Sequence, residues 1–170
     1  MLSLLTQPTT ARVNILTYDV FGKKSDRIYV VDAPRCAAAT PDHINEMIAS
    51  IEDNTRQIYI MAKEKNKIAE KIAANLDFLR LSKRYLSHEQ IESFASFSNI
   101  SERNSRTLRQ VLQEIDALKS LDAVKRELLH TNSDLNLVYD ELEAILELQR
   151  RALGCLEDII GSGKALMRLF

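Results

Sequence analysis

The sequence contains little glycine and proline, the two residues that helix interiors tolerate least. Of its 170 residues, four are glycine and three are proline, and neither occurs between Pro41 and Gly154. This scarcity predicts long helices over most of the chain. The length suffices for one domain with its own core, or for one elongated assembly element, and it is too short for two full-sized domains.

Cysteine and long apolar runs are also scarce. Cys36 and Cys155 lie far apart and show no Cys-x-x-Cys or Cys/His ligand spacing, so the sequence indicates neither a disulfide framework nor a zinc site. We therefore expect a reducing, cytoplasmic environment. No apolar run reaches the ~18 residues that a membrane-spanning helix needs, so no transmembrane segment is predicted.

The overall charge is balanced, but its distribution is uneven. Lysine and arginine number 23 and aspartate and glutamate 24, giving a net charge of −1. This predicts no nucleic-acid partner and no global attraction to an anionic membrane, so a charge-driven partner must be met locally. Residues 63–84 carry seven basic and three acidic side chains, whereas residues 113–147 carry nine acidic and three basic ones. We expect these two segments to pair with each other.

A long first helix is predicted from Pro41 to about Tyr85. Thr40 is a favourable N-cap, Pro41 suits the first helical position, and Asp42 is favourable at the positive end of the helix dipole. A heptad seam follows, interrupted by only two polar residues. Its members are Ile44, Ile48, Ile51, Thr55, Ile58, Ala62, Lys65, Ala69, Ile72, Leu76 and Leu79.

Two further helix starts are indicated by capping-box spacing. Ser87 and Gln90 are placed to cap each other's end of a short second helix. Asn99 and Glu102 repeat this spacing, so we expect a third helix to begin there.

A second heptad seam runs through the C-terminal part of the chain. Its members are Val124, Leu128, Thr131, Leu135, Val138, Leu142, Ile145, Gln149, Ala152, Leu156 and Ile159. Residues 130–134 are weak helix formers and Ser133 could cap a new helix, but the heptad phase passes through them unshifted. We therefore favour one continuous helix to about Ile160. Apolar residues beside this seam recur every seven positions at Tyr139, Leu146, Leu153 and Ile160, so this helix requires more than one neighbour.

The N-terminal part has a different pattern, typical of a β-hairpin. Residues 13–21 and 27–31 are rich in β-branched and aromatic side chains and flank a polar turn. Both faces of the hairpin carry apolar residues, including Leu16, Tyr18, Val20, Ile28, Tyr29 and Val31. One helical layer can cover only one face of a ribbon, so either residues 1–5 or another chain must cover the second.

Two motifs suggest chemistry but lack required parts. Residues 159–165, IIGSGKA, end like a phosphate-binding loop, but Asp158 stands where a glycine is needed and Ala165 where serine or threonine is needed. We instead expect Gly161 to end the helix. Glu127 and His130 have the Glu-x-x-His spacing of di-iron bundles, which need two such motifs. We predict no cofactor, no metal and no catalytic residue.

The domain organisation follows from these patterns. We expect an N-terminal segment and β-hairpin over 1–34, a linker over 35–41, a long-helix bundle over 42–161 and an apolar C-terminal tail over 162–170. The tail must be buried, either on its own bundle or in a groove of a partner. Candidate partner-binding residues are those of the hairpin faces together with Tyr139, Leu146, Leu153, Leu166, Leu169 and Phe170.

The predicted fold class is mainly α: an elongated antiparallel helical bundle or coiled-coil hairpin with an N-terminal β-hairpin. Our preferred hypothesis is a non-enzymatic structural or adaptor subunit that mediates protein–protein assembly as a homo- or hetero-oligomer. One alternative is a compact four-helix bundle that binds a metal or small ligand. Another is an effector or chaperone that binds a client protein.

Overall fold

The computed structural model describes residues 12–13, 17–18, 24–25, 29–30, 39–130 and 133–170. This part of the chain is mainly helical. Its helices are α3 (Pro41–Leu81), α4 (His88–Ala117), α5 (Leu121–Glu127) and α6 (Leu135–Met167). At ~1.5 Å per residue, the 41 residues of α3 extend for roughly 60 Å, which sets the length of the bundle.

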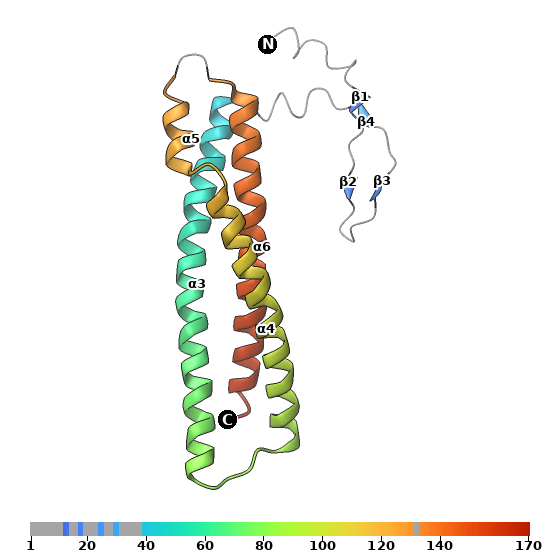
Figure 1. The fold of residues 1–170 in the computed structure, drawn as a ribbon, viewed down its shortest axis with the longest axis vertical. Coiled ribbons are helices and arrows are strands. Elements are labelled where there is room, and N and C mark those ends of the chain that lie inside the picture. Colours follow the sequence, from blue (N-terminus) through green and yellow to red (C-terminus); the bar gives the residue numbers. More distant parts are fainter. Residues whose placement is uncertain (1–11, 14–16, 19–23, 26–28, 31–38, 131–132) are drawn as a thin grey trace.

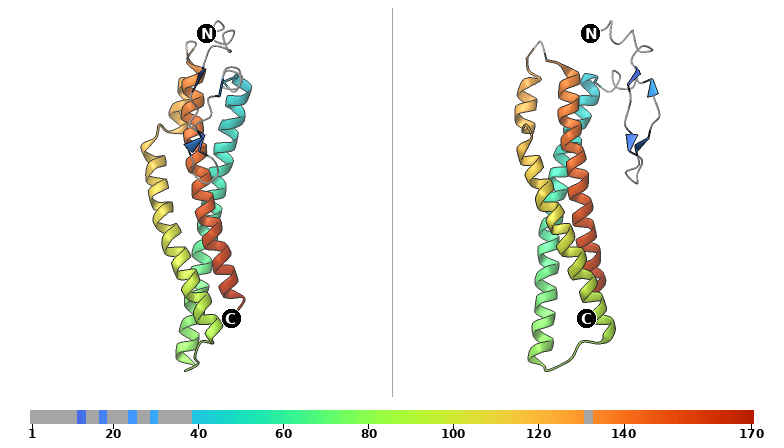
Figure 2. Two further views of the ribbon diagram at one scale, coloured as in Figure 1. Left: turned by 90° about the vertical axis from the view of Figure 1, so that its right-hand side faces the viewer. Right: turned by 45° about the vertical axis from the view of Figure 1, so that its right-hand side comes forward.

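The helices form an elongated bundle with α6 at its centre (Figure 1). Helix α3 descends from what we call the upper end, α4 and α5 return upwards, and α6 descends again. Helices α3 and α6 therefore run parallel, and α4 is antiparallel to both. Both α3 and α4 pack chiefly against α6. The views in Figure 2 show the same elongated shape.

The apolar core is divided into three clusters along the bundle. The upper cluster joins α3, α5 and α6, and its buried members are Ile44, Met47, Ile51, Val124, Val138, Leu142 and Ile145. The middle cluster joins α4 and α6 and contains Leu108, Val111, Ala152, Cys155 and Leu156. The lower cluster joins α3 and α6 through Ile68, Ile72, Ile160 and Leu166, with Phe94 and Phe97 of α4 packed against it.

Thr55 and Gln149, one polar interruption of each predicted seam, meet in the bundle. Gln149 Nε2 donates to Thr55 Oγ1 at 3.0 Å and to the carbonyl oxygen of Ile51 at 3.2 Å. Thr55 Oγ1 in turn donates to the same carbonyl at 2.8 Å. A buried polar pair of this kind favours one register over its alternatives, because sliding either helix would leave the amide unpaired.

Short strands are described in the N-terminal part. They are β1 (Arg12–Val13), β2 (Thr17–Tyr18), β3 (Lys24–Ser25) and β4 (Tyr29–Val30). β1 pairs with β4 and β2 with β3, both antiparallel and in one common register. The remaining residues of the predicted hairpin lie outside the described residues, so the hairpin stays a prediction.

The predicted helix starts at Thr40 and Ser87 are confirmed. Thr40 Oγ1 accepts from the backbone N–H of His43, with Pro41 as the first helical residue. Ser87 and Gln90 form the complete capping box at the start of α4. The helix expected to begin at Asn99 is wrong, because α4 continues through that residue. The face of α4 that is turned toward the bundle includes two polar residues, Ser101 and Asn104, which interrupt its apolar repeat.

The continuous helix expected from Leu121 to Ile160 is also wrong. Helix α5 ends at Glu127, and α6 begins after Asp134, whose Oδ1 accepts from the N–H groups of Asn136 and Leu137. Ser133 does not cap α6; its hydroxyl donates to the carbonyls of Glu127 and His130. The break turns the chain back, so that α6 descends beside α3.

This reversal also overturns the expected pairing of the charged segments. The basic part of α3 lies in the lower half of the bundle, whereas the acidic residues 113–147 lie in the upper half. The ion pairs that α3 makes with other helices use its acidic residues instead: Glu52 pairs with Lys125 and Glu64 with Lys164.

The glycines near the C-terminus do not end α6, contrary to the expectation for Gly161. The helix continues to Met167. Gly163 faces α3: a Cβ at this position would lie 2.6 Å from Ile68 Cγ2 and 3.3 Å from Phe97 Cε2. Gly163 therefore allows three helices to approach closely at the lower cluster.

Candidate interaction surfaces

Exposed apolar side chains gather at the lower end of the bundle. Five large ones are contributed by the end of α3, the α3–α4 loop, the start of α4 and the C-terminus. We call this surface the tip: Phe78, Leu81, Tyr85, Ile91 and Phe170, of which Tyr85 is 95% and Leu81 79% exposed. The presence of five such residues toward one end of the bundle makes the tip a candidate interaction site.

The α3–α4 loop at the tip has a defined geometry. The N–H of Arg84 donates to the carbonyl of Leu79 at 2.9 Å, and that of Lys83 to the carbonyl of Arg80 at 3.2 Å. This is a Schellman motif, which normally places glycine in the left-handed conformation. Here Lys83 takes that position, with φ 51°. A side chain there costs on the order of 1 kcal/mol relative to glycine.

The C-terminus is tied to the same end of the bundle. Gln90 Nε2, beyond its capping-box role, donates to the carbonyl of Leu169 at 2.7 Å. Leu166 is completely buried in the lower cluster, and Met167 packs against it. Most of the predicted tail therefore belongs to its own bundle, and Leu166 is not available to a partner, whereas Phe170 remains exposed.

The tip carries an excess of positive charge. Arg80, Lys83, Arg84 and Arg168 are exposed, and no acidic group among the described residues lies within ion-pair distance of them. The acidic residues of the same region are Asp77, Glu89 and Glu92, the last of which lies 3.1 Å from His88.

A second surface is the outer groove between α3 and α6 in the upper half of the bundle. Its apolar stripe consists of Tyr139, Leu146 and Leu153, all half-buried. The Tyr139 ring stacks on His43, with ring centroids 5.9 Å apart. A cavity of about 240 Å³ lies between the two helices, lined by His43, Glu46, Met47, Ser50, Tyr139, Glu143, Leu146 and Arg150.

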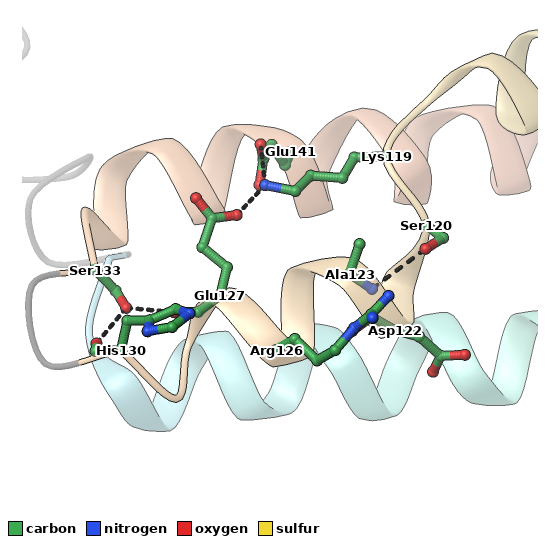
Figure 3. Close-up of polar contacts among 9 residues, drawn as sticks. All are labelled: Lys119, Ser120, Asp122, Ala123, Arg126, Glu127, His130, Ser133 and Glu141. Carbon is green, nitrogen blue, oxygen red and sulfur yellow. Dashed lines mark hydrogen bonds and ion pairs between the residues drawn. The ribbon is translucent and has the colours of Figure 1, made fainter.

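Polar contacts fix the junction of α4, α5 and α6 near the upper end (Figure 3). Lys119 donates to Glu127 and lies 3.4 Å from Glu141. The hydrogen bond to Glu127 raises the pKa of Lys119, and the charge of Glu141 acts in the same direction. Ser120 caps α5 by accepting from the N–H of Ala123. These contacts anchor the short helix that carries the chain into its reversal.

The Glu-x-x-His motif and residues 159–165 have structural roles. Glu127 pairs with Lys119, and His130 is exposed beyond the end of α5. Residues 159–165 are helical, and Lys164 pairs with Glu64 at 2.6 Å. Burial raises the pKa of the Cys155 thiol, which lies in the middle cluster. In the described parts of the chain, no group of three metal-ligating side chains is found.

The hairpin residues remain candidates. Leu16, Val20, Ile28 and Val31 lie outside the described residues, and for Tyr18 and Tyr29 only the strand assignment is described. The tip was missed in the sequence analysis, although a signal existed. Phe78 and Leu81 fall beside the seam rather than in it, and basic residues alternate with them.

Within the described ranges, no helix carries an apolar stretch long enough to cross a bilayer. Comparison of the chain with protein-family models, curated proteins and solved structures finds no match.

Proposed function

We propose that the chain is a non-enzymatic assembly subunit, a rigid elongated bundle that joins protein partners through its N-terminal hairpin and the outer face of α6. The main support is the stripe Tyr139, Leu146 and Leu153. It stays half-buried after α3 and α4 have covered two other sides of α6. A partner helix laid in this groove would complete a four-helix arrangement.

The predicted hairpin is connected to the same end of the bundle. The chain enters α3 at Ala39, at the upper end, where the side chain of Ala39 is buried. Eight residues, 31–38, separate β4 from this point, and they can span at most ~30 Å. This is about half the length of α3, so β4, at the base of the predicted hairpin, can reach the stripe but not the tip. We propose that the apolar faces of the hairpin and the stripe form one upper contact region.

Co-purification from native cells, followed by mass spectrometry, tests the proposal with the full chain and with a chain lacking residues 1–34. Because the helix caps and the three core clusters described above consist of residues from Thr40 onward, we expect helix content by circular dichroism to persist while partner association falls. Replacing Tyr18 or Tyr29 with aspartate is a gentler version, in which at least one variant should weaken association at constant helix content.

The control is Glu157→Gln, an exposed position on α6 outside the stripe. It should leave association unchanged. If the full chain sediments as a monomer and captures no partner, the proposal is wrong. Loss of helicity in the truncated chain would instead make the hairpin an internal cap of the bundle.

A further inference from the structure

The tip combines exposed apolar side chains with exposed cations. Its five apolar side chains, Phe78, Leu81, Tyr85, Ile91 and Phe170, protrude from the end of the bundle. Four exposed cations, Arg80, Lys83, Arg84 and Arg168, lie in the same region, which also contains three acidic residues, Asp77, Glu89 and Glu92. Amphipathic aromatic residues with neighbouring lysine and arginine are typical of protein surfaces that enter the headgroup region of an anionic bilayer.

The shape of the tip favours a lipid surface over a protein partner. It is formed by a helix end, a loop, a helix start and the chain terminus, which lie toward one extremity of an elongated body (Figure 2). A protein partner would typically place its own anchors in a hollow. The hollows described here lie on the flanks: between α3 and α5, between α3 and α6, and between α4 and α6.

Hydrogen bonds to the backbone define the arrangement of the loop and the C-terminus at the tip. The Schellman motif orients the loop, and the hydrogen bond from Gln90 to the carbonyl of Leu169 holds the C-terminus beside the start of α4. Lys83 occupies a left-handed position that glycine would fill with less strain. Backbone strain often occurs at functional sites. The strained residue here is a lysine, which places a cation in the loop of the tip.

We propose that the tip docks on an anionic membrane surface, with Leu81, Tyr85 and their apolar neighbours in the headgroup region and the four cations facing lipid phosphates. This goes beyond the proposed protein assembly, which uses the opposite end of the bundle. The bundle would then hold the start of α3 roughly 60 Å from the bilayer, which is the length of that helix.

Vesicle flotation of the full chain tests this, using phosphatidylcholine alone and phosphatidylcholine mixed with phosphatidylserine. We expect binding to the mixed vesicles only, weakened by salt. Leu81→Asp should abolish binding, whereas Leu112→Asp, at an exposed apolar position on the flank of α4, should not. Because the chain contains no tryptophan, Tyr85→Trp provides a single reporter whose emission should shift to the blue on the mixed vesicles.

The charge contribution is tested with Lys83→Gly and the flank control Arg109→Gln. Lys83→Gly should reduce vesicle affinity about fivefold, which corresponds to the ~1 kcal/mol of one basic side chain near an anionic surface. The melting temperature should not fall, because glycine suits the left-handed position. Arg109→Gln should change neither quantity.

Three results would overturn the proposal: no binding to phosphatidylserine vesicles, equal loss from tip and flank variants, or capture of an acidic protein by the tip without any vesicle binding. Deleting residues 1–34 should leave vesicle binding intact. The membrane proposal and the assembly proposal can therefore fail independently.

Discussion

Substituting alanine for glycine should have opposite effects at two positions of α6 that are two residues apart. Gly161 is exposed, and an added Cβ would meet nothing within 4 Å. Gly161→Ala should therefore stabilise the fold by up to ~1 kcal/mol, the difference in helix propensity. At Gly163 the added Cβ would lie 2.6 Å from Ile68 Cγ2.

The clash at Gly163 cannot be relieved by a small side-chain rotation. Ile68 is β-branched and lies in a helix, where its χ1 angle is strongly restricted, so α3 itself must move away from α6. Overpacking of this kind costs about 1–3 kcal/mol, against a propensity gain of up to ~1 kcal/mol. Gly163→Ala should therefore lower the free energy of unfolding by about 1 kcal/mol.

Urea denaturation followed by circular dichroism measures both variants against the unmodified chain. The expected outcome is a higher midpoint for Gly161→Ala and a lower one for Gly163→Ala, with unchanged m-values. If both substitutions stabilise equally, the close approach of α3 and α6 at the lower cluster is wrong. Because the two variants share the same helix and the same chemical change, propensity alone cannot produce opposite signs.

Two further predictions concern the upper half of the bundle. Leu142→Ala should lower the free energy of unfolding by about 2–5 kcal/mol, because Leu142 is fully buried. The substitution Glu143→Ala at the exposed neighbouring position should lower it by under ~0.5 kcal/mol. Equal losses in urea denaturation would mean that the faces of α6 are misassigned. The hydrogen bond from Lys125 lowers the pKa of the Glu52 carboxyl group. The contact between Glu52 and Lys125 therefore stabilises the fold above the pKa that Glu52 has in the unfolded chain. This contribution is lost as the pH falls through the lower pKa that Glu52 has in the folded chain. The difference in melting temperature between the unmodified chain and Glu52→Gln should therefore disappear in acid, and a constant difference at all pH values would contradict this.

The heptad pattern did not reveal the directions of the helices. Thr55 and Gln149 were visible as polar interruptions of two seams, but their contact follows only from the parallel arrangement of α3 and α6. A seam repeats every seven residues in a continuous helix, and it can keep that phase across a loop of suitable length. The unshifted phase at residues 130–134 therefore did not distinguish a continuous helix from a reversal.

The two candidate surfaces also differ in whether the sequence could predict them. The stripe Tyr139, Leu146 and Leu153 was predictable because residues seven apart lie on one face of a helix. The tip was not, since it is composed of residues from positions 78–91 and from Phe170, which are distant in sequence. Leu166 was expected to be available to a partner, but it is buried because α6 continues past Gly161 and Gly163.

The sequence by itself determined the helical class, the caps at Thr40 and Ser87, and the apolar faces, because each depends on propensities and hydrogen bonds within a few residues. The tertiary structure decided where α5 ends, that α6 runs parallel to α3, and that the charged segments expected to pair lie in opposite halves of the bundle. These features depend on the burial of side chains from distant segments in shared clusters, which can outweigh the small local preferences that residues 99–102 and 130–134 express.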